Sequence, residues 1–246
     1  MSVQLIHGDC IAKMKDLKDS SVDIIITDLP YGMFHKKKRE NTNWDHAINL
    51  NDMWREIWRV GKKNCPVFMF ADMRFAATLI NSQPKWFKYD IAWIKNQSTN
   101  PMNMKYMFGK ATEYILVFYK KRPTYNVFKY HKVKKELPNE INGGILGRSG
   151  VDSYTKRYYE PKLPLNVINC GNVHNKNKWK CGITEKPVQI MEHLLKYYSN
   201  EGDTCLDICM GSGSTGEACL NMNRNFIGIE LNDKHFEICE KRLQKK

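Results

Sequence analysis

Short apolar runs rich in β-branched and aromatic residues recur along this chain and alternate with segments of helical spacing. The runs cover residues 22–27, 66–70, 91–94, 114–119, 204–209 and 225–230. Apolar residues recur every three or four positions over 50–58, and helices are expected over 186–198, 215–222 and 233–243. Continuous apolar runs are typical of buried parallel strands. Their alternation with helices predicts an α/β fold with a doubly wound, mostly parallel sheet.

Length and composition set the scale of this fold. The chain has 246 residues, of which 42% are apolar and 26% charged. That length suits one large α/β domain, or one domain with a sizeable insertion. The proportions exclude a disordered tail, a collagen and a disulfide-rich miniprotein. The formal net charge of +13 predicts a polyanionic partner, with nucleic acid as the first choice and an acidic membrane surface as the second.

The positive charge is concentrated in one segment. Residues 120–180 contain fourteen Lys and Arg but only four Asp and Glu, a net charge of +10. This segment is also rich in Gly, Pro and Asn and lacks a sustained helical period, so we interpret it as an irregular insertion that contacts phosphates. A second basic cluster near the N-terminus comprises Lys36, Lys37, Lys38 and Arg39.

The sequence contains no sign of export or of a membrane span. No run approaches the roughly 18 apolar residues of a transmembrane helix. The eight cysteines form no CxxC pair, which favours a reducing, cytoplasmic environment and a soluble protein. Cys170, His174 and Cys181 match no standard zinc spacing, so we predict no metal site.

A glycine-rich motif follows the run at 204–209. Asp207 lies near the end of that run, and Gly211, Gly213 and Gly216 lead into the next helix. Glycines at such a turn let the backbone approach a ligand closely, and Glu230 at the end of the following run is placed to bind both ribose hydroxyls of a nucleoside. No Gly-Lys-Ser/Thr follows, which argues against a phosphate-binding P-loop. The motif alone predicts an adenosine-containing cofactor.

A second motif, Asp28-Leu29-Pro30-Tyr31-Gly32, follows the run at 22–27. Taken alone it could be a strand-ending turn with a buried Tyr. In a doubly wound sheet, however, both motifs belong at the carboxyl edge. If their strands flank the switch point, where the strand order reverses, the motifs face each other across the ligand crevice.

Together, Asp28-Leu-Pro-Tyr-Gly and Asp207-x-x-x-Gly-Ser-Gly-Ser-Thr-Gly, in that order, resemble the beta class of amino-group DNA methyltransferases of bacterial and phage modification systems. Further similarities lie at 44–45, 87–95, 113–119, 123–126 and 184–187. The resemblance implies a Rossmann-like methyltransferase sheet and S-adenosyl-L-methionine as cofactor. It divides the chain into a catalytic part (1–119), a target-recognition insertion (120–182) and a cofactor-binding part (183–246). Because this class is permuted, we infer that the strand 3–7 completes the cofactor half of the sheet.

The resemblance assigns the site residues. Asp28 and the carbonyl of Leu29 would accept the N–H groups of the target amine, Pro30 would fix the turn, and Tyr31 would stack on a flipped base. The cofactor-binding residues would be Asp9, Cys10, Asp28, Thr184, Lys186, Asp207, Met210, Gly211, Ser212, Gly213, Glu230 and Leu231. Leu29 stands where the family commonly has Pro, and Ile208-Cys209 where it has Pro-Phe.

The implied partner is double-stranded DNA, with a flipped adenine as the methyl acceptor at N6. Its expected contacts are Lys36, Lys37, Lys38, Arg39, Trp93, Lys134, Lys135, Arg148 and Arg157, although a Trp in an apolar strand is more often core. Cytosine N4 or an RNA base is an alternative acceptor, but N4 enzymes more often carry Ser in place of Asp28. An inactive DNA-binding protein of the same fold is a further alternative. The sequence does not decide whether the protein forms a homodimer or works with a companion restriction nuclease.

Overall fold

The computed structural model describes residues 1–30, 48–135, 157–173, 179 and 185–244. By its internal contacts the chain divides into a large unit, residues 1–125 with 166–246, and a small unit, residues 126–165. The small unit lies within the predicted insertion 120–182. The flanking residues 120–125 and 166–173 belong to the large unit.

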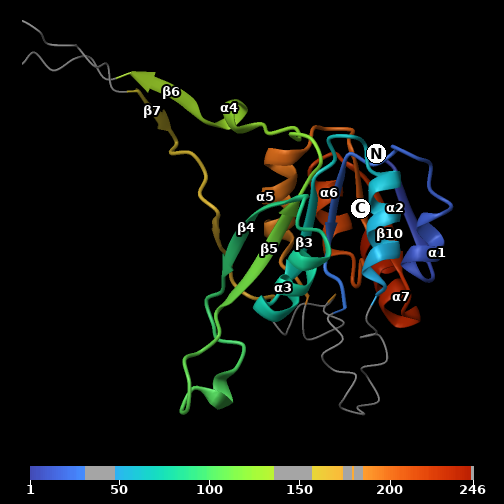
Figure 1. The fold of residues 1–246 in the computed structure, drawn as a ribbon, viewed down its shortest axis with the longest axis horizontal. Helices are drawn as coiled ribbons and strands as arrows, with labels where there is room; N and C mark the ends of the chain where they lie inside the picture. The colour runs from blue at the N-terminus through green and yellow to red at the C-terminus, as the bar shows by residue number, and fades with distance from the viewer. Residues whose placement is uncertain (31–47, 136–156, 174–178, 180–184, 245–246) are drawn as a thin grey trace, which may run out of the picture. The chain divides into compact units, whose positions relative to one another are not determined.

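An eight-stranded sheet runs through the large unit (Figure 1). Its strands, in spatial order, are β1 (Val3–His7), β10 (Asn225–Glu230), β9 (Thr204–Asp207), β2 (Ile24–Thr27), β3 (Val67–Ala71), β5 (Thr112–Phe118), β4 (Phe87–Ile94) and β8 (Val167–Asn169). All neighbouring pairs are parallel except those of β5, which runs antiparallel to both β3 and β4. The predicted mostly parallel sheet is therefore confirmed.

Helices cover both faces of this sheet. One core joins alternate strand residues such as Ile25 and Val67 to α1 (Cys10–Met14), α2 (Leu50–Val60) and α3 (Met73–Ser82). The other core joins residues such as Ile24 and Phe68 to α5 (Val188–Tyr198), α6 (Ser214–Asn221) and α7 (Asp233–Leu243). Because successive side chains of a strand point to opposite faces, a continuous apolar run supplies both cores at once.

The expected helix over 50–58 is α2, which extends to Val60. The side chain of Asn49 caps its first turn by accepting the backbone N–H groups of Asn51 and Asp52. Met53 and Ile57 are fully buried on its inner face, as the three-to-four spacing predicts. Helix α3 was not predicted, although Asp72 caps it in the same manner by accepting the N–H of Phe75.

Two strands differ from expectation. The sequence places the run at 114–119 among the parallel strands, but β5 is antiparallel to its neighbours. A loop connects β4 to β5, whereas a parallel neighbour would require a crossover connection such as a helix. Strand β8 lies in the predicted irregular insertion, yet it pairs with β4 at the sheet edge and buries Ile168. Three residues are too few for a periodic signal.

The strand inferred at residues 3–7 is confirmed as β1. It pairs parallel to β10, with Val3 opposite Phe226 and His7 opposite Glu230. The N-terminal segment thus supplies the edge strand beside the last strand of the chain, as the permuted order predicted.

The small unit contains α4 (Val127–Tyr130) and two antiparallel strands, β6 (Lys132–Lys135) and β7 (Arg157–Glu160). Lys134 pairs with Glu160 across the ladder. The carbonyl of Pro161 accepts a hydrogen bond of 2.9 Å from the ring of His131. Part of the predicted irregular insertion is therefore regular structure.

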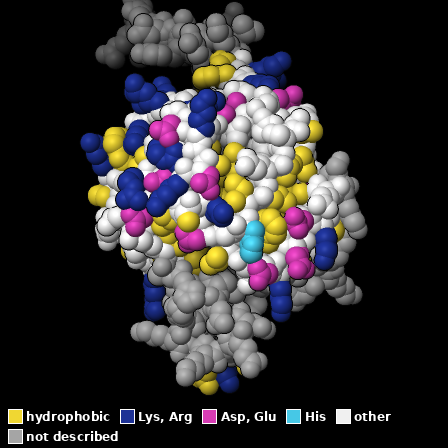
Figure 2. Space-filling view, turned by 90° about the vertical axis from the view of Figure 1, so that its right-hand side faces the viewer, with side chains coloured by type: hydrophobic (Ala, Val, Ile, Leu, Met, Phe, Trp, Pro, Cys, Tyr) yellow, Lys and Arg dark blue, Asp and Glu magenta, His cyan; other side chains and the backbone are white. Residues whose placement is uncertain are grey.

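Charges of both signs are mixed on the face that Figure 2 shows, which includes α1 and α2. Arg59 on α2 contacts both Glu56 and Asp19, and Arg55 contacts Asp52. These ion pairs offset the charges of Arg55 and Arg59. Among the described residues, no helix is long and apolar enough to cross a bilayer.

Candidate active site at the carboxyl edge of the sheet

The two sequence motifs meet at the carboxyl edge of neighbouring strands. Strands β9 and β2 pair in parallel, with Ile24 opposite Cys205 and Ile25 opposite Leu206. Asp207 ends β9 and Asp28 follows β2 directly. From this point the chain winds through β10 to one side and through β3 to the other, so the motifs flank the switch point, as predicted.

Asp28 stands at one end of a row of alternating charges. Its Oδ2 atom lies 2.5 Å from Nζ of Lys186, and that ammonium lies 3.7 Å from Oε2 of Glu113. Glu113 in turn pairs with Lys95 through its other oxygen. The row joins β5, the residue after β4 and the segment before α5 to the end of β2.

Burial and the neighbouring charges together set the pKa values of the two lysines in this row. Burial by itself would lower the pKa of Lys186, but the carboxylates of Asp28 and Glu113 outweigh it, so that this pKa is raised. Burial lowers the pKa of Lys95, and its pairing with Glu113 only partly opposes this. The ammonium of Lys186 is therefore a fixed positive charge beside the Asp28 carboxylate.

Leu29 is buried and Pro30 half-buried. Tyr31, the last residue of the predicted catalytic motif, lies outside the described residues, as do Thr184, Arg148 and the cluster Lys36, Lys37, Lys38 and Arg39.

Asp207 anchors the start of the glycine-rich turn. Its carboxylate accepts a hydrogen bond of 2.7 Å from the hydroxyl of Thr215 and one of 3.1 Å from the backbone N–H of Cys209. Burial raises the pKa of Asp207 to about 7, although these two hydrogen bonds oppose the rise. Asp207 is thus a structural acid that ties β9 to the first turn of α6.

Glu230, at the end of β10, holds the same turn from the other side. Its two carboxylate oxygens accept the backbone N–H groups of Gly211, at 2.9 Å, and Asn232, at 2.8 Å. Gly211 has a φ of +52°, and a methyl group built on its Cα would meet no atom within 4 Å. The backbone of the turn therefore faces open space beside an acid, which fits the approach of a nucleoside.

Gly213 is required for a different reason. It has a φ of +82°, and a Cβ atom there would lie 2.6 Å from Sγ of Cys239 on α7. This glycine lets the turn pack directly on α7. Arg242, also on α7, donates to the carbonyl and the hydroxyl of Ser212, both at 3.1 Å, so the last helix of the chain fixes the turn.

The remaining predicted cofactor residues are spread around this edge. The N–H of Gly8 donates to the carbonyl of Glu230 at 2.9 Å, which places the adjoining Asp9 beside β10, and Asp9 caps α1 by accepting the N–H of Ala12. Cys10 and Met210 are buried, whereas Leu231 is exposed.

The structure describes only some of the predicted DNA contacts, and one of them is buried. Trp93 is only 2% exposed, and its indole N–H donates to the carbonyl of Cys170 at 2.7 Å, which fits the core alternative and leaves no ring face open to a base. Lys134 is exposed on β6 of the small unit. The backbones of Lys135 and Arg157 are opposite each other in the register of β6 and β7.

Sequence reasoning gave no role to Glu113, Lys95 or Arg242. The only local signal for Glu113 was an acid near the start of an otherwise apolar strand. One of its partners, Lys95, lies 18 positions away, and the other, Lys186, lies in a distant segment of the sequence. Arg242 sits in a helix with many exposed charges, so its burial could not be distinguished from the pattern.

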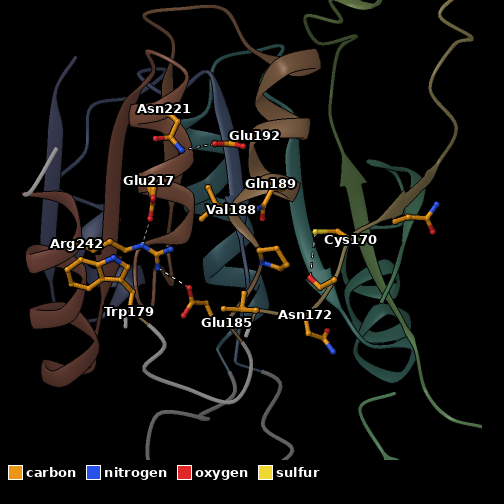
Figure 3. Close-up of a pocket in the computed structure, with 14 residues that line it drawn as sticks. Cys170, Asn172, Trp179, Glu185, Val188, Gln189, Glu192, Glu217, Asn221 and Arg242 are labelled. Atoms are coloured by element: carbon orange, nitrogen blue, oxygen red, sulfur yellow. Dashed lines mark hydrogen bonds and ion pairs between the residues drawn. The ribbon is translucent and has the colours of Figure 1, made fainter. Parts of the chain in front are cut away.

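A polar cavity of about 780 Å³ adjoins the glycine-rich turn, because its lining residue Arg242 also bonds to Ser212 (Figure 3). Side chains of α5, α6 and α7 line it, among them Glu192, Glu217 and Arg242, together with Trp179 and residues 169–173. Figure 3 shows Arg242 between Glu217 and Glu185, to which it donates at 2.6 and 3.0 Å. No residue of the predicted cofactor set lines this cavity.

Comparison with known proteins agrees with this arrangement. A family model described as DNA methylase (N6_N4_Mtase) matches residues 22–241. The type II methyltransferase M.HpaI of Haemophilus parainfluenzae is 28% identical over 249 residues, which cover 99% of this chain and 74% of that protein. The DNA adenine methyltransferase YhdJ of Escherichia coli is 24% identical over 97% of this chain and 82% of that protein. A crystal structure of the M1.HpyAVI–SAM complex matches with a TM-score of 0.64 and 26% identity, over 98% of this chain and all of that one. The chain belongs to the N6/N4 DNA methylase family.

Proposed function

We propose that this DNA methyltransferase transfers a methyl group from S-adenosyl-L-methionine to the exocyclic N6 of an adenine flipped out of duplex DNA. The observation that carries the proposal is the meeting of Asp28 with the Asp207–Gly213 turn at the ends of two neighbouring strands. A methyl donor bound at the turn and an amine bound at Asp28 would lie side by side, which is what a direct transfer requires.

The residues at the turn fit the cofactor. The open space beside Gly211 admits a ligand close to the backbone, and the Glu230 carboxylate keeps acceptor capacity beyond its two backbone N–H bonds. When bound, S-adenosyl-L-methionine supplies a sulfonium methyl group, which needs no further activation. The chain therefore has to activate only the nucleophile.

An exocyclic aromatic amine is a poor nucleophile because its lone pair is delocalised into the ring. The carboxylate of Asp28 and the carbonyl of Leu29 would each accept one N–H of this amine and draw its nitrogen towards tetrahedral geometry. The ammonium of Lys186 supports this role because its ion pair holds the Asp28 side chain in place. Tyr31 would stack on the flipped base.

Two observations favour adenine over cytosine as the acceptor. Asp stands at position 28, where N4 enzymes more often have Ser, and one relative is itself described as a DNA adenine methyltransferase. Cytosine N4 is the second candidate. A non-catalytic DNA-binding role is less favoured because Asp28, Pro30 and the glycine turn are all intact.

The lysines of β6, including Lys134 and Lys135, are the proposed phosphate contacts of the target-recognition segment. The cluster Lys36, Lys37, Lys38 and Arg39 follows the catalytic motif directly and is the proposed second contact. A homodimer and a companion restriction nuclease stay predictions.

The test is methylation of plasmid DNA of mixed sequence, followed by digestion to nucleosides and mass spectrometry. We expect N6-methyl-2′-deoxyadenosine from the wild type and none from Asp28→Ala. N4-methylcytosine would overturn the choice of acceptor. Absence of any methylated base, under conditions in which the protein binds the cofactor in calorimetry, would overturn the enzymatic proposal.

A further inference from the structure

The loop between β4 and β5 exposes an unusual set of large apolar side chains. Within residues 95–111, Phe108 is 99% exposed, Met102 86% and Tyr106 80%. Met104 and Met107 are also exposed. Single exposed apolar residues are normal on a protein surface, but a contiguous group of five marks a binding surface.

This loop is an ordered structure. The backbone N–H of Thr99 donates to the carbonyl of Lys110 at 2.8 Å, and the N–H of Lys110 donates to the side chain of Asn100 at 2.6 Å. A 3-10 turn at Pro101–Asn103 occupies its tip, and a Cβ at Gly109 would lie 2.9 Å from the hydroxyl of Ser98. These contacts fix the backbone at the base of the loop, and the side chain of Phe108 projects from it into solvent.

The base of the loop is connected to the proposed catalytic carboxylate. Lys95 and Glu113 flank the loop and pair with each other. Glu113 lies 3.7 Å from Lys186, which binds Asp28. Strand β4 is parallel in direction to β2 and β3, so the loop leaves the same carboxyl edge of the sheet as Asp28; Figure 1 shows it extending from the lower ends of β4 and β5.

The charge of the loop favours DNA as the occupant over a second copy of the chain. Residues 96–110 contain Lys105 and Lys110 and no acid. Lys110 lies 3.4 Å from the carboxylate of Asp72, so Lys105 supplies most of the positive charge that the loop presents. The ammonium of Lys105 lies 5.1 Å from the ring centre of Tyr106, so cation and aromatic surface are presented together. Such a combination suits stacked bases between phosphates. A second copy of this loop would offer no acid to pair with Lys105, whereas DNA offers phosphates.

Extracting a base from a duplex leaves a gap in the stack, and proteins that distort DNA insert Phe, Leu or Met side chains between base steps. We propose that the loop 96–110 is an apolar wedge, with Phe108 entering the space that the target base vacates. This inference rests on the proposed function, since it presumes that a base is flipped towards Asp28. It adds a residue that acts on the duplex and not on the reacting amine.

The test compares two duplexes that carry the sequence methylated by the wild type. In one, the target base is paired normally; in the other, an abasic site replaces its partner, so that extrusion is easy. Phe108→Ala should lower kcat/KM on the paired duplex by roughly 10-fold to 100-fold, because extrusion costs a few kcal/mol that the wedge offsets in part. On the abasic duplex the variant should approach the wild type. Phe108→Leu, which keeps apolar bulk, is the matched control and should stay close to wild type on both.

An equal loss on both duplexes would overturn the wedge, since a contact or folding defect does not depend on base pairing. Unchanged activity of Phe108→Ala on the paired duplex would do the same. Sedimentation showing that Phe108→Ala converts a dimer to a monomer would reassign the loop to a contact between copies. The wild type on the same duplexes reports separately on the proposed function, because digestion of the methylated duplex to nucleosides identifies the acceptor whatever the result for Phe108→Ala.

Discussion

The Nζ atom of Lys186 lies 2.5 Å from Oδ2 of Asp28, although 158 positions separate the two residues in the sequence. The sequence resemblance had placed Lys186 near the cofactor. In the structure it binds the carboxylate that we propose to activate the amine, and it belongs to a row that continues to Glu113 and Lys95. The row connects the catalytic motif to the base of the exposed loop.

Lys186→Met should destabilise the fold because it leaves the Asp28 carboxylate without its cation. We expect a loss of roughly 2 kcal/mol in the free energy of unfolding, on the scale of hydrogen bonds to charged groups. Adding Asp28→Asn to this variant should recover part of the loss, which a double-mutant cycle of urea unfolding measures. Strictly additive losses would show that the two side chains are not coupled.

Asp28→Ala should abolish methyl transfer while cofactor and duplex binding stay nearly intact. Removing one preorganised acceptor of this kind typically lowers turnover by about 100-fold to 1000-fold. Tritiated methyl transfer to plasmid DNA, beside a gel-shift measurement, separates the two effects. Tyr31→Phe is the matched control, since stacking needs the ring and not the hydroxyl. Full activity in Asp28→Ala would contradict the mechanism.

Glu230→Ala should weaken the binding of S-adenosyl-L-methionine by roughly 1.5 to 3 kcal/mol, measured by calorimetry without DNA. The carboxylate is expected to bind the ribose hydroxyls, and it also holds Gly211 and Asn232 in the turn. Asp233→Asn is a nearby control that removes an acid whose side chain is 84% exposed. Equal affinity in Glu230→Ala and the wild type would contradict the assignment.

Asp207 should make the fold less stable as the pH rises. Its pKa is about 7 in the folded protein against 3.8 for an aspartate side chain in water, so between these values the folded state keeps a proton that the unfolded state has lost. Between pH 5 and pH 8 the wild type should therefore lose roughly 2 to 3 kcal/mol relative to Asp207→Asn. Urea unfolding of both proteins at the two pH values checks this. Parallel pH profiles would show that Asp207 does not titrate in this range.

Neutralising Lys134 and Lys135 together should reduce the salt dependence of DNA binding. Each phosphate contact contributes roughly −0.9 to the slope of log affinity against log salt, so the slope should flatten by up to about two units. Lys241→Gln, a change to an exposed lysine on α7, should leave the slope unchanged. If the double variant keeps the wild-type slope, the DNA surface lies elsewhere.

The sequence by itself determined the main elements of the cofactor half and the chemistry of its motifs. The run at 22–27 ending at Asp28, the run at 204–209 and the glycines that follow it carry local signals, because a buried strand needs continuous apolar residues and a tight turn needs positive φ. The place of β1 beside β10 followed from the order of the motifs.

Only the tertiary structure decided the direction of β5, the pairing of β8 and the contacts of Lys186 with Asp28 and Glu113. Periodicity reports which face of an element is buried, but it does not report which distant element covers that face. In the sequence, a charged residue that will be buried cannot be told from one that stays on the surface. The free-energy cost of burying it is offset by a partner that only the fold brings within reach.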